Sequence, residues 1–177
     1  MKAEFKNKFD IMEKDREEII SLINKLDDQK LNFKPAPGKW SILQILFHII
    51  KAEHLTIISL KNSIGNKKDL KKSSLGAAMR SSLLNISLRS SIKIKSPDIL
   101  KKVPETYDIE QLKKKWTTLR SELNKILNGA EEEVLNKYVF KHPYAGRLNF
   151  TQSIEFLYEH VKHHKRQIKR INDLLSH

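Results

Sequence analysis

The sequence predicts an all-α fold, a four-helix bundle whose longest connection lies between the second and third helices. Four long stretches repeat apolar residues at alternating steps of three and four, as expected of helices that bury one face. Gly and Pro number only five each among 177 residues, which disfavours an all-β fold rich in tight turns. We expect a single domain, residues 1–177, because a chain of this length can bury a core of its own.

The first two helices are separated by a clear stop. The first is expected from about Phe9 to Asp28, because the prolines and glycine of residues 33–38 cannot continue a helix. The second begins after Ser41, which forms a capping-box pattern with Gln44 three residues on. An apolar stripe follows this cap, so this helix is also expected to bury one face.

The connection between the second and third helices, residues 65–107, is the hardest stretch to interpret. Met79, Leu83 and Ile86 can line one face of a short extra helix around residues 76–90. Prolines follow this stretch and indicate an irregular connection. We therefore expect a long link between the second and third helices that contains a short helix.

The third and fourth helices have well-marked starts. The third is expected from the cap Asp108 to Asn128, where the following glycine is a typical stop. The fourth opens near Phe150, with Asn149 or Thr151 as its cap, and continues almost to the C-terminus. Both carry a continuous apolar stripe, which completes the set of four bundle helices.

The net charge of +13 does not by itself indicate a nucleic-acid partner. Such a partner favours basic residues that cluster on one face and alternate with aromatic side chains. Here many of the lysines are scattered through a polar, serine-rich stretch, so a solvated surface is the simpler interpretation. The basic outer face of the fourth helix is also ordinary for an amphipathic helix.

Composition also limits the location of the protein and its chemistry. No segment approaches the roughly 18 consecutive apolar residues of a membrane span. The first 16 residues carry charges throughout, which is not the pattern of a secretory signal, so we expect a cytoplasmic protein with no membrane partner. The chain has no cysteine, which excludes disulfides and thiolate ligands, so a bound metal must be held by nitrogen and oxygen.

Three histidines are candidates for a metal site. His160 and His164 lie roughly 40° apart on the fourth helix and about 6 Å along its axis, so both imidazoles can reach one ion. His164 occupies the middle of the apolar stripe, and His48 lies at the edge of the stripe on the second helix. Three imidazoles with an open position form a catalytic zinc-type site that suits Zn, Ni, Fe or Co. The residues alone also allow three separate, hydrogen-bonded core histidines.

Three other histidines are expected outside this group. His163 lies well round the helix from the apolar stripe and is expected at the rim or in solvent. His54 falls on a different helix face from His48 and is expected to be exposed. His142 precedes a proline, and we expect it to anchor the loop before the fourth helix rather than to bind metal.

Three motifs spread over nearly the whole chain resemble the signatures of the DinB/YfiT-like superfamily. They are the run Lys39–His48 (KWSILQILFH) followed by Ala52-Glu53, the run His142–Phe150 (HPYAGRLNF), and His160-x3-His164-x2-Gln167-Ile168. Trp116-x3-Arg120 and Pro104 also fit the habit of this family. Residues 65–103 contribute least to the resemblance.

This resemblance implies a four-helix bundle, often dimeric, with a divalent metal on three histidines that match His48, His160 and His164. Zn or Ni is the expected metal, with Fe, Co and Mn as alternatives. Gln167, one turn beyond His164, can orient a ligand imidazole, although a surface role is equally open. Glu53 can act as a base or accept a hydrogen bond from a ligand, or it can be a surface charge.

The function implied by the resemblance is metal-dependent hydrolysis or thiol transfer on a small-molecule substrate. Relatives include bacillithiol and mycothiol transferases and isomerases, and a chain without cysteine needs a small-molecule thiol as its second substrate. The alternative is a non-catalytic binding or stress-response module with a structural metal or none, whose basic surface contacts nucleic acid. The sequence identifies no general acid or base.

Overall fold

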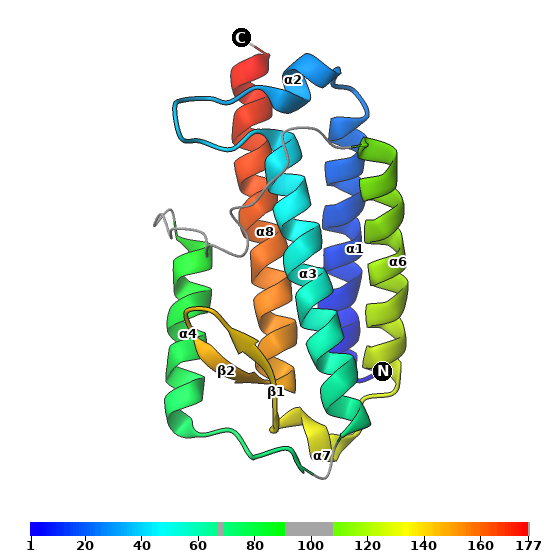
Figure 1. Cartoon of the computed structure of the whole chain (residues 1–177), viewed down its shortest axis with the longest axis vertical. Coiled ribbons are helices and arrows are strands. Elements are labelled where there is room, and N and C mark those ends of the chain that lie inside the picture. Colours follow the sequence, from blue (N-terminus) through cyan, green and yellow to red (C-terminus); the bar gives the residue numbers. More distant parts are fainter. Residues whose placement is uncertain (67–68, 91–107, 177) are drawn as a thin grey trace.

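Four long helices form the bundle that the sequence predicts (Figure 1). The structure is a computed structural model that describes residues 1–66, 69–90 and 108–176. The expected proline-containing link, including Pro104, therefore lies outside the described residues. The bundle helices are α1 (Ala3–Ile23), α3 (Ile42–Gly65), α6 (Ile109–Asn128) and α8 (Phe150–Leu175).

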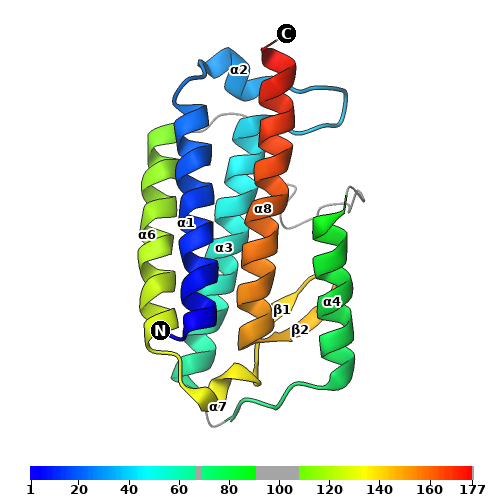
Figure 2. The ribbon, with the colours of Figure 1, turned by 180° about the vertical axis from the view of Figure 1, so that it is seen from behind.

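The direction of the helices explains the long connection. α1 and α8 run one way, whereas α3 and α6 run the other way (Figures 1 and 2). α1 packs against α6 and α8, and α3 also packs against α6 and α8. Because α3 and α6 are consecutive among the bundle helices and parallel, the chain must return along the bundle between them, as in bundles with a crossover connection.

The predicted caps begin three of the four helices. Ser41 and Asn149 form complete capping boxes with the glutamines three residues on, and Asp108 accepts hydrogen bonds from two backbone amides. Asn149, rather than Thr151, is therefore the cap of α8. The first helix is shifted from its predicted range, because the side chain of Asp27 starts a separate helix, α2 (Asp28–Asn32).

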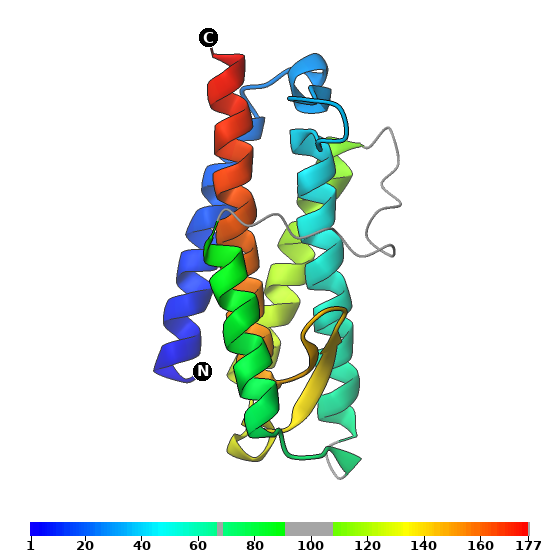
Figure 3. The same cartoon turned by 90° about the vertical axis from the view of Figure 1, so that its left-hand side faces the viewer.

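A small β-hairpin, which the sequence analysis does not predict, lies against the lower half of the bundle (Figure 3). Its strands are β1 (Tyr138–His142) and β2 (Gly146–Asn149), and they follow the short helix α7 (Glu132–Leu135). Gly146 has a φ of +69° where the turn leads into β2. This is a left-handed conformation, which favours glycine. The hairpin packs against α3, α4 and α8.

α3 is the most apolar bundle helix. By length and composition it could cross a membrane, since an 18-residue window reaches a mean hydropathy of 1.3. However, 61% of this window is buried inside the protein, where α3 packs against α6, α8 and β1. A helix that is covered on several sides is expected to be apolar nearly all round, so its composition follows from its place in the core.

The predicted short helix exists as α4 (Leu75–Arg89), which packs against α8 and β2. Met79, Leu83 and Ile86 line one of its faces, as the spacing indicates, but this face is exposed. The opposite face packs inward through Ala77, Ser81, Leu84 and Leu88.

Candidate metal centre

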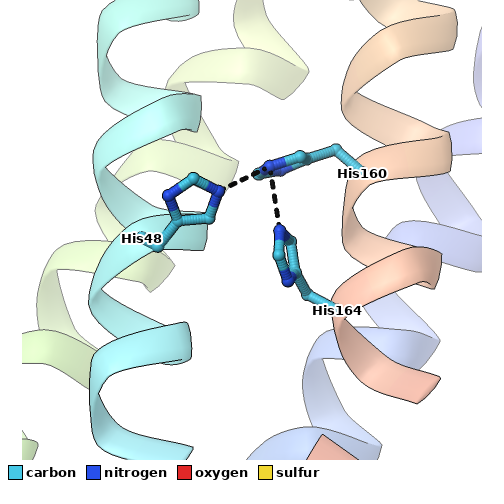
Figure 4. Close-up of side chains that lie close together, drawn as sticks. All are labelled: His48, His160 and His164. Carbon is cyan, nitrogen blue, oxygen red and sulfur yellow. Dashed lines mark hydrogen bonds between the residues drawn. The ribbon is translucent and has the colours of Figure 1, made fainter. Parts of the chain in front are cut away.

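The structure brings the three candidate histidines together in the interior (Figure 4). His48 extends from α3, and His160 and His164 extend from the facing side of α8. The Nε2 atom of His160 lies 3.0 Å from Nε2 of His48 and 3.2 Å from Nε2 of His164. The three side chains are 4–7% exposed, so they form a compact and nearly enclosed cluster.

The separation of the nitrogens fits one metal ion. A tetrahedral ion with bonds of about 2.0–2.1 Å to imidazole nitrogen holds those nitrogens about 3.3 Å apart. The two Nε2 separations of 3.0 and 3.2 Å are close to this value, and all three candidate ligand atoms lie within 4.8 Å of one another. Small movements of the rings are therefore enough to form a three-nitrogen site with further positions open.

The opposite nitrogen of one ring, that of His164, supports this arrangement. An imidazole that binds a metal through Nε2 carries its proton on Nδ1, which then needs an acceptor. Nδ1 of His164 lies 3.0 Å from Oε1 of Gln167, so this ring can donate to the glutamine and keep its Nε2 lone pair free. Nδ1 of His48 and Nδ1 of His160 are buried and have no hydrogen-bond partner among the described residues.

Burial keeps the three rings neutral. It lowers the pKa of His48 to about 4 and lowers the pKa values of His160 and His164 well below the ordinary value. Neighbouring imidazoles lower the pKa values of His160 and His164 further, because two adjacent charged rings would repel. A neutral imidazole is the form that can offer a lone pair to a metal.

Aromatic rings pack on two of the three histidines. Trp40 packs on His48 with 4.9 Å between ring centroids, and Phe156 packs on His160 at 5.1 Å. Within the described residues, the group that could hold a metal consists of these histidines and includes no carboxylate. A divalent ion held there by neutral rings would keep its full charge, which favours an anionic or strongly polar ligand in the open position.

Glu53, for which the sequence allows a base, a hydrogen-bond acceptor or a surface charge, is buried and contacts side chains of α6. Its carboxylate accepts hydrogen bonds from Nε1 of Trp116 at 3.1 Å and from Nη2 of Arg120 at 2.7 Å. These partners belong to α6, whereas the histidine cluster lies between α3 and α8. Both oxygens of Glu53 are thus engaged in the packing of α3 against α6.

Two of the other histidines have structural contacts, and His54, which was expected to be exposed, is half-buried. Nδ1 of His142 accepts hydrogen bonds from the backbone N–H groups of Tyr144 and Ala145, which confirms its anchoring role in the loop. His163 is half-buried, and its Nδ1 lies 2.8 Å from the carbonyl oxygen of Leu88 at the end of α4. The structure therefore places His163 at the rim, as expected, with a contact to α4 that helical spacing could not indicate.

Sequence reasoning missed the groups that surround the cluster. Trp40 precedes the cap of α3, and its place in the same motif as His48, eight residues earlier, is the sequence signal for their contact. Phe156 lies one turn before His160 on α8, so helical spacing could have indicated that these rings meet. The hairpin side chain His142 also packs on Phe156, with 4.7 Å between centroids, and no local pattern indicates this contact.

Comparison with known proteins agrees with this architecture. A family model described as the DinB superfamily matches residues 11–168. YuaE of Bacillus subtilis, described as an uncharacterized protein, is 27% identical over 153 residues, which cover 85% of this chain and 88% of YuaE.

A solved structure gives the same fold. YfiT from Bacillus subtilis superposes with a TM-score of 0.70 at 13% sequence identity, and the match covers 99% of this chain and 90% of the YfiT chain. YfiT is described as a probable metal-dependent hydrolase with an unusual four-helix bundle topology. At this identity, the likeness establishes the shared fold alone.

Proposed function

The chain belongs to the DinB superfamily, and on that premise we propose that it is a metal-dependent enzyme, a hydrolase, with its metal on His48, His160 and His164. The observation that carries this proposal is the convergence of three buried Nε2 atoms at separations of 3.0 and 3.2 Å. A divalent transition metal bound to three imidazoles keeps an open position, acts there as a Lewis acid and lowers the pKa of a water ligand.

The residues of the chain hold and orient this centre. α3 and α8 supply ligands from two rigid helices, so the separation of the nitrogens is set by helix packing rather than by a mobile loop. Gln167 accepts the Nδ1 proton of His164 and fixes the orientation of that ring. Trp40 and Phe156 shield the rings from water, which strengthens the interaction of the site with a polar substrate.

Hydrolysis is the reaction class we favour, because YfiT, which shares the fold, is described as a probable metal-dependent hydrolase. A small-molecule substrate with a carbonyl or phosphoryl oxygen suits an uncompensated divalent charge. Thiol transfer uses the same kind of centre but needs a small-molecule thiol as second substrate, since the chain has no cysteine. The two reactions therefore differ in a way that an assay can separate.

The first test is metal analysis of protein purified without a histidine tag. We expect about one divalent ion for each chain in the wild type, and a loss of most of it in His48→Ala and in His164→Ala. His54→Ala and His163→Ala are the matched controls and should retain the ion, because neither ring belongs to the cluster. Wild-type protein that holds no stoichiometric ion after gentle purification and metal reloading would contradict the proposal.

The second test separates an enzyme from a protein with a structural metal. Cobalt-substituted protein has visible absorption that changes when an added ligand enters the coordination sphere. We expect azide to change the spectrum of the wild type, because three protein ligands leave a position open. A panel of ester, amide and phosphoester substrates, assayed with and without a small-molecule thiol, then distinguishes hydrolysis from thiol transfer. An inert cobalt spectrum would indicate a closed, structural site.

A further inference from the structure

α4 has its larger apolar side chains on the outside. Its inward face uses small residues, Ala77 and Ser81, beside two leucines. Its outward face carries four large apolar side chains that are 58–90% exposed, and they are called here the α4 stripe: Leu75, Met79, Leu83 and Ile86. An ordinary surface helix turns side chains of this kind toward the core, so the α4 stripe is open to a partner.

The α4 stripe is one continuous surface. Its spacing of four, four and three residues keeps the four side chains within roughly 80° of one another around the helix. Together they present roughly 500 Å² of apolar area, which is near the upper end for the largest patch on a monomer. α4 lies on the outside of the bundle, in front of α8 in Figure 3. The stripe therefore extends along one side of the molecule.

The surface around the α4 stripe is positively charged. Residues 70–90, which contain α4, and residues 134–154, which contain the β-hairpin, include no Asp or Glu, although the whole chain has 21. The exposed cations of these two stretches are Lys71, Lys72, Arg80, Arg89, Lys141 and Arg147. Lysines that look scattered in the sequence are thus part of a basic surface that two separate segments build.

Contacts between α4 and the β-hairpin bring these cations to one side of the molecule. Nε of Arg80 donates to the carbonyl oxygen of Ala145 in the hairpin turn at 2.9 Å, and α4 also packs against β2. Two acidic side chains approach α4 from α8, Glu155 and Glu159, and both pair with Arg89. The other exposed cations form no ion pair within the described part of the chain, so their charge is available to a partner.

The cations of α4 itself border the stripe on both sides. Around the helix, Arg80 lies roughly 100° from the middle of the stripe, and Arg89 lies roughly 75° from it in the other direction. Long cationic side chains at such borders can lie along an apolar surface and extend their charged ends into a polar layer. A helix that lies in the plane of a membrane surface combines an apolar face and cations in this way.

We propose that the α4 stripe inserts into the surface of an anionic membrane, with α4 parallel to the bilayer plane. The stripe enters the boundary between head groups and acyl chains, and the exposed cations of α4 and the β-hairpin contact the acidic head groups. The expectation of no membrane partner considered spanning segments, and a helix that lies along the surface needs none. This docking is independent of the metal centre proposed above.

Charge and apolar area together favour a membrane over other occupants. A duplex nucleic acid matches the positive charge but offers no apolar layer for the α4 stripe. A second copy of this chain offers an apolar surface but brings the same net charge of +13. An anionic bilayer provides both an acidic surface and an apolar layer beneath it.

Sedimentation with vesicles tests the docking directly. We expect the wild type to bind vesicles of phosphatidylglycerol and phosphatidylcholine at low salt, to bind pure phosphatidylcholine weakly, and to be released as salt rises. Leu83→Glu should weaken binding roughly tenfold or more, because it places a carboxylate in the apolar layer. Leu174→Glu is the matched control, because Leu174 on α8 is also 61% exposed but lies outside the stripe. Circular dichroism shows whether Leu83→Glu remains folded, and Met79→Ser disrupts the same face without adding charge.

Charge reversal tests the contribution of the β-hairpin. Lys141→Glu combined with Arg147→Glu should weaken binding to the anionic vesicles roughly tenfold or more. Lys114→Glu combined with Lys125→Glu makes the same change in net charge on α6, which lies on the other side of the bundle from α4 (Figure 1). This control should retain most of the binding. Equal losses in the two double variants would mean that net charge alone attracts the protein, which contradicts docking through this surface.

A single fluorescent label shows whether the α4 stripe enters the bilayer. The chain has no cysteine, so Met79→Cys gives a unique thiol for a polarity-sensitive fluorophore. Its emission should brighten and shift to the blue on anionic vesicles, whereas a label on Leu174→Cys should not respond.

Two other occupants of the stripe have distinct outcomes. A wild type of twice the chain mass that Leu83→Glu converts to the mass of one chain would place a second copy on the stripe. Salt-sensitive binding to duplex DNA that exceeds binding to anionic vesicles would favour nucleic acid. Either result, or a protein that stays in solution beside anionic vesicles at low salt, would overturn the proposal.

Discussion

α3 carries two buried polar clusters that differ in one respect. Toward α6, both oxygens of the Glu53 carboxylate have donors, Trp116 and Arg120, and Arg120 also lies 3.5 Å from Glu13. Toward α8, His48 meets two other histidines whose Nε2 atoms converge on one point. The first cluster matches negative charge with positive charge. The second gathers lone pairs of the same kind.

This difference separates a structural cluster from a candidate site. Burial raises the pKa of Glu53, and Arg120 and Trp116 oppose this rise by stabilising the carboxylate. Both oxygens of the Glu53 carboxylate are paired without a ligand, although Nε and Nη1 of Arg120 have no hydrogen-bond partner among the described residues. The histidine cluster is the one that can gain from an added cation, because its Nε2 atoms lie 3.0 and 3.2 Å apart and an ion between them would bind lone pairs that otherwise face one another. The predictions below test this distinction.

The largest effect is expected in the structural cluster. Arg120→Ala leaves the buried Glu53 without its cation, and we expect the free energy of unfolding to fall by about 3–5 kcal/mol. Urea denaturation of the metal-free protein measures this change. Glu122→Ala, which breaks the more exposed pair with Lys61, is the control and should cost at most about 1 kcal/mol. Equal losses in the two variants would show that the Glu53 cluster does not stabilise the core.

The histidine cluster should respond to metal instead. We expect added Zn²⁺ or Ni²⁺ to stabilise the wild type by about 4 kcal/mol when the free ion exceeds its Kd a thousandfold. His160→Ala should lose most of this gain, because it removes the ring that lies between the other two. Thermal melts with and without the ion measure the difference. If added metal stabilises His160→Ala as much as it stabilises the wild type, the metal binds at a site other than the histidine cluster.

The sequence predicts best those features that local rules decide. Asp108 and Asn149 are caps because their side chains accept from nearby backbone amides, and both interactions lie within three residues. The inward position of His164 follows from helical spacing in the same way, since it interrupts a continuous apolar stripe. His48 could be added to the pair only by assuming which helices are neighbours, and the structure brings it within reach.

Other features depend on contacts that no local pattern records. The spacing of Met79, Leu83 and Ile86 predicts that they share one face of a helix, and they do. The spacing does not tell whether this face is buried, and in the structure it is exposed. The strands of the hairpin are only four and five residues long, which is too short for a clear alternating pattern. The contacts of Glu53 could not be predicted for the same reason, because its partners lie more than sixty residues away in the sequence.

His142 is an intermediate case between the two clusters. It is buried like the three histidines, but its Nδ1 has backbone donors. Burial lowers its pKa to about 4, so as the pH falls below the ordinary value of 6.5 the unfolded chain takes up a proton first. Its contribution to stability is therefore complete above pH 6.5 and is lost as the pH falls toward 4.

We expect this loss to reach about 2 kcal/mol between pH 7 and pH 5 for the metal-free protein. His142→Asn keeps a side-chain acceptor but cannot take up a proton, so its stability should depend less on pH than that of the wild type. Urea midpoints at both pH values give the comparison. Parallel pH dependence in the two proteins would show that His142 does not titrate in this range.

The last effect, on metal affinity rather than on stability, is expected at Gln167, which lies one turn beyond His164 on α8. Gln167→Leu removes the acceptor that lies 3.0 Å from Nδ1 of His164, so the ring can rotate or adopt the other tautomer. We expect metal affinity to fall 10- to 100-fold, or about 1.4–2.7 kcal/mol. Competition with a chelator of known affinity measures this change. The stability of the metal-free protein should change much less, because Gln167 is only partly buried.

Gln167→Glu is the matched control, since it keeps an acceptor at the same distance from the helix. A carboxylate is a stronger acceptor than an amide, so it should hold the Nδ1 proton of His164 and make Nε2 a better donor to the metal. Affinity in this variant should equal or exceed that of the wild type. If the leucine and glutamate variants both bind metal as tightly as the wild type, the Gln167 contact belongs with the structural contacts of the bundle. If only the leucine variant is weakened, the hydrogen bond distinguishes His164 from a buried histidine that merely fills the core.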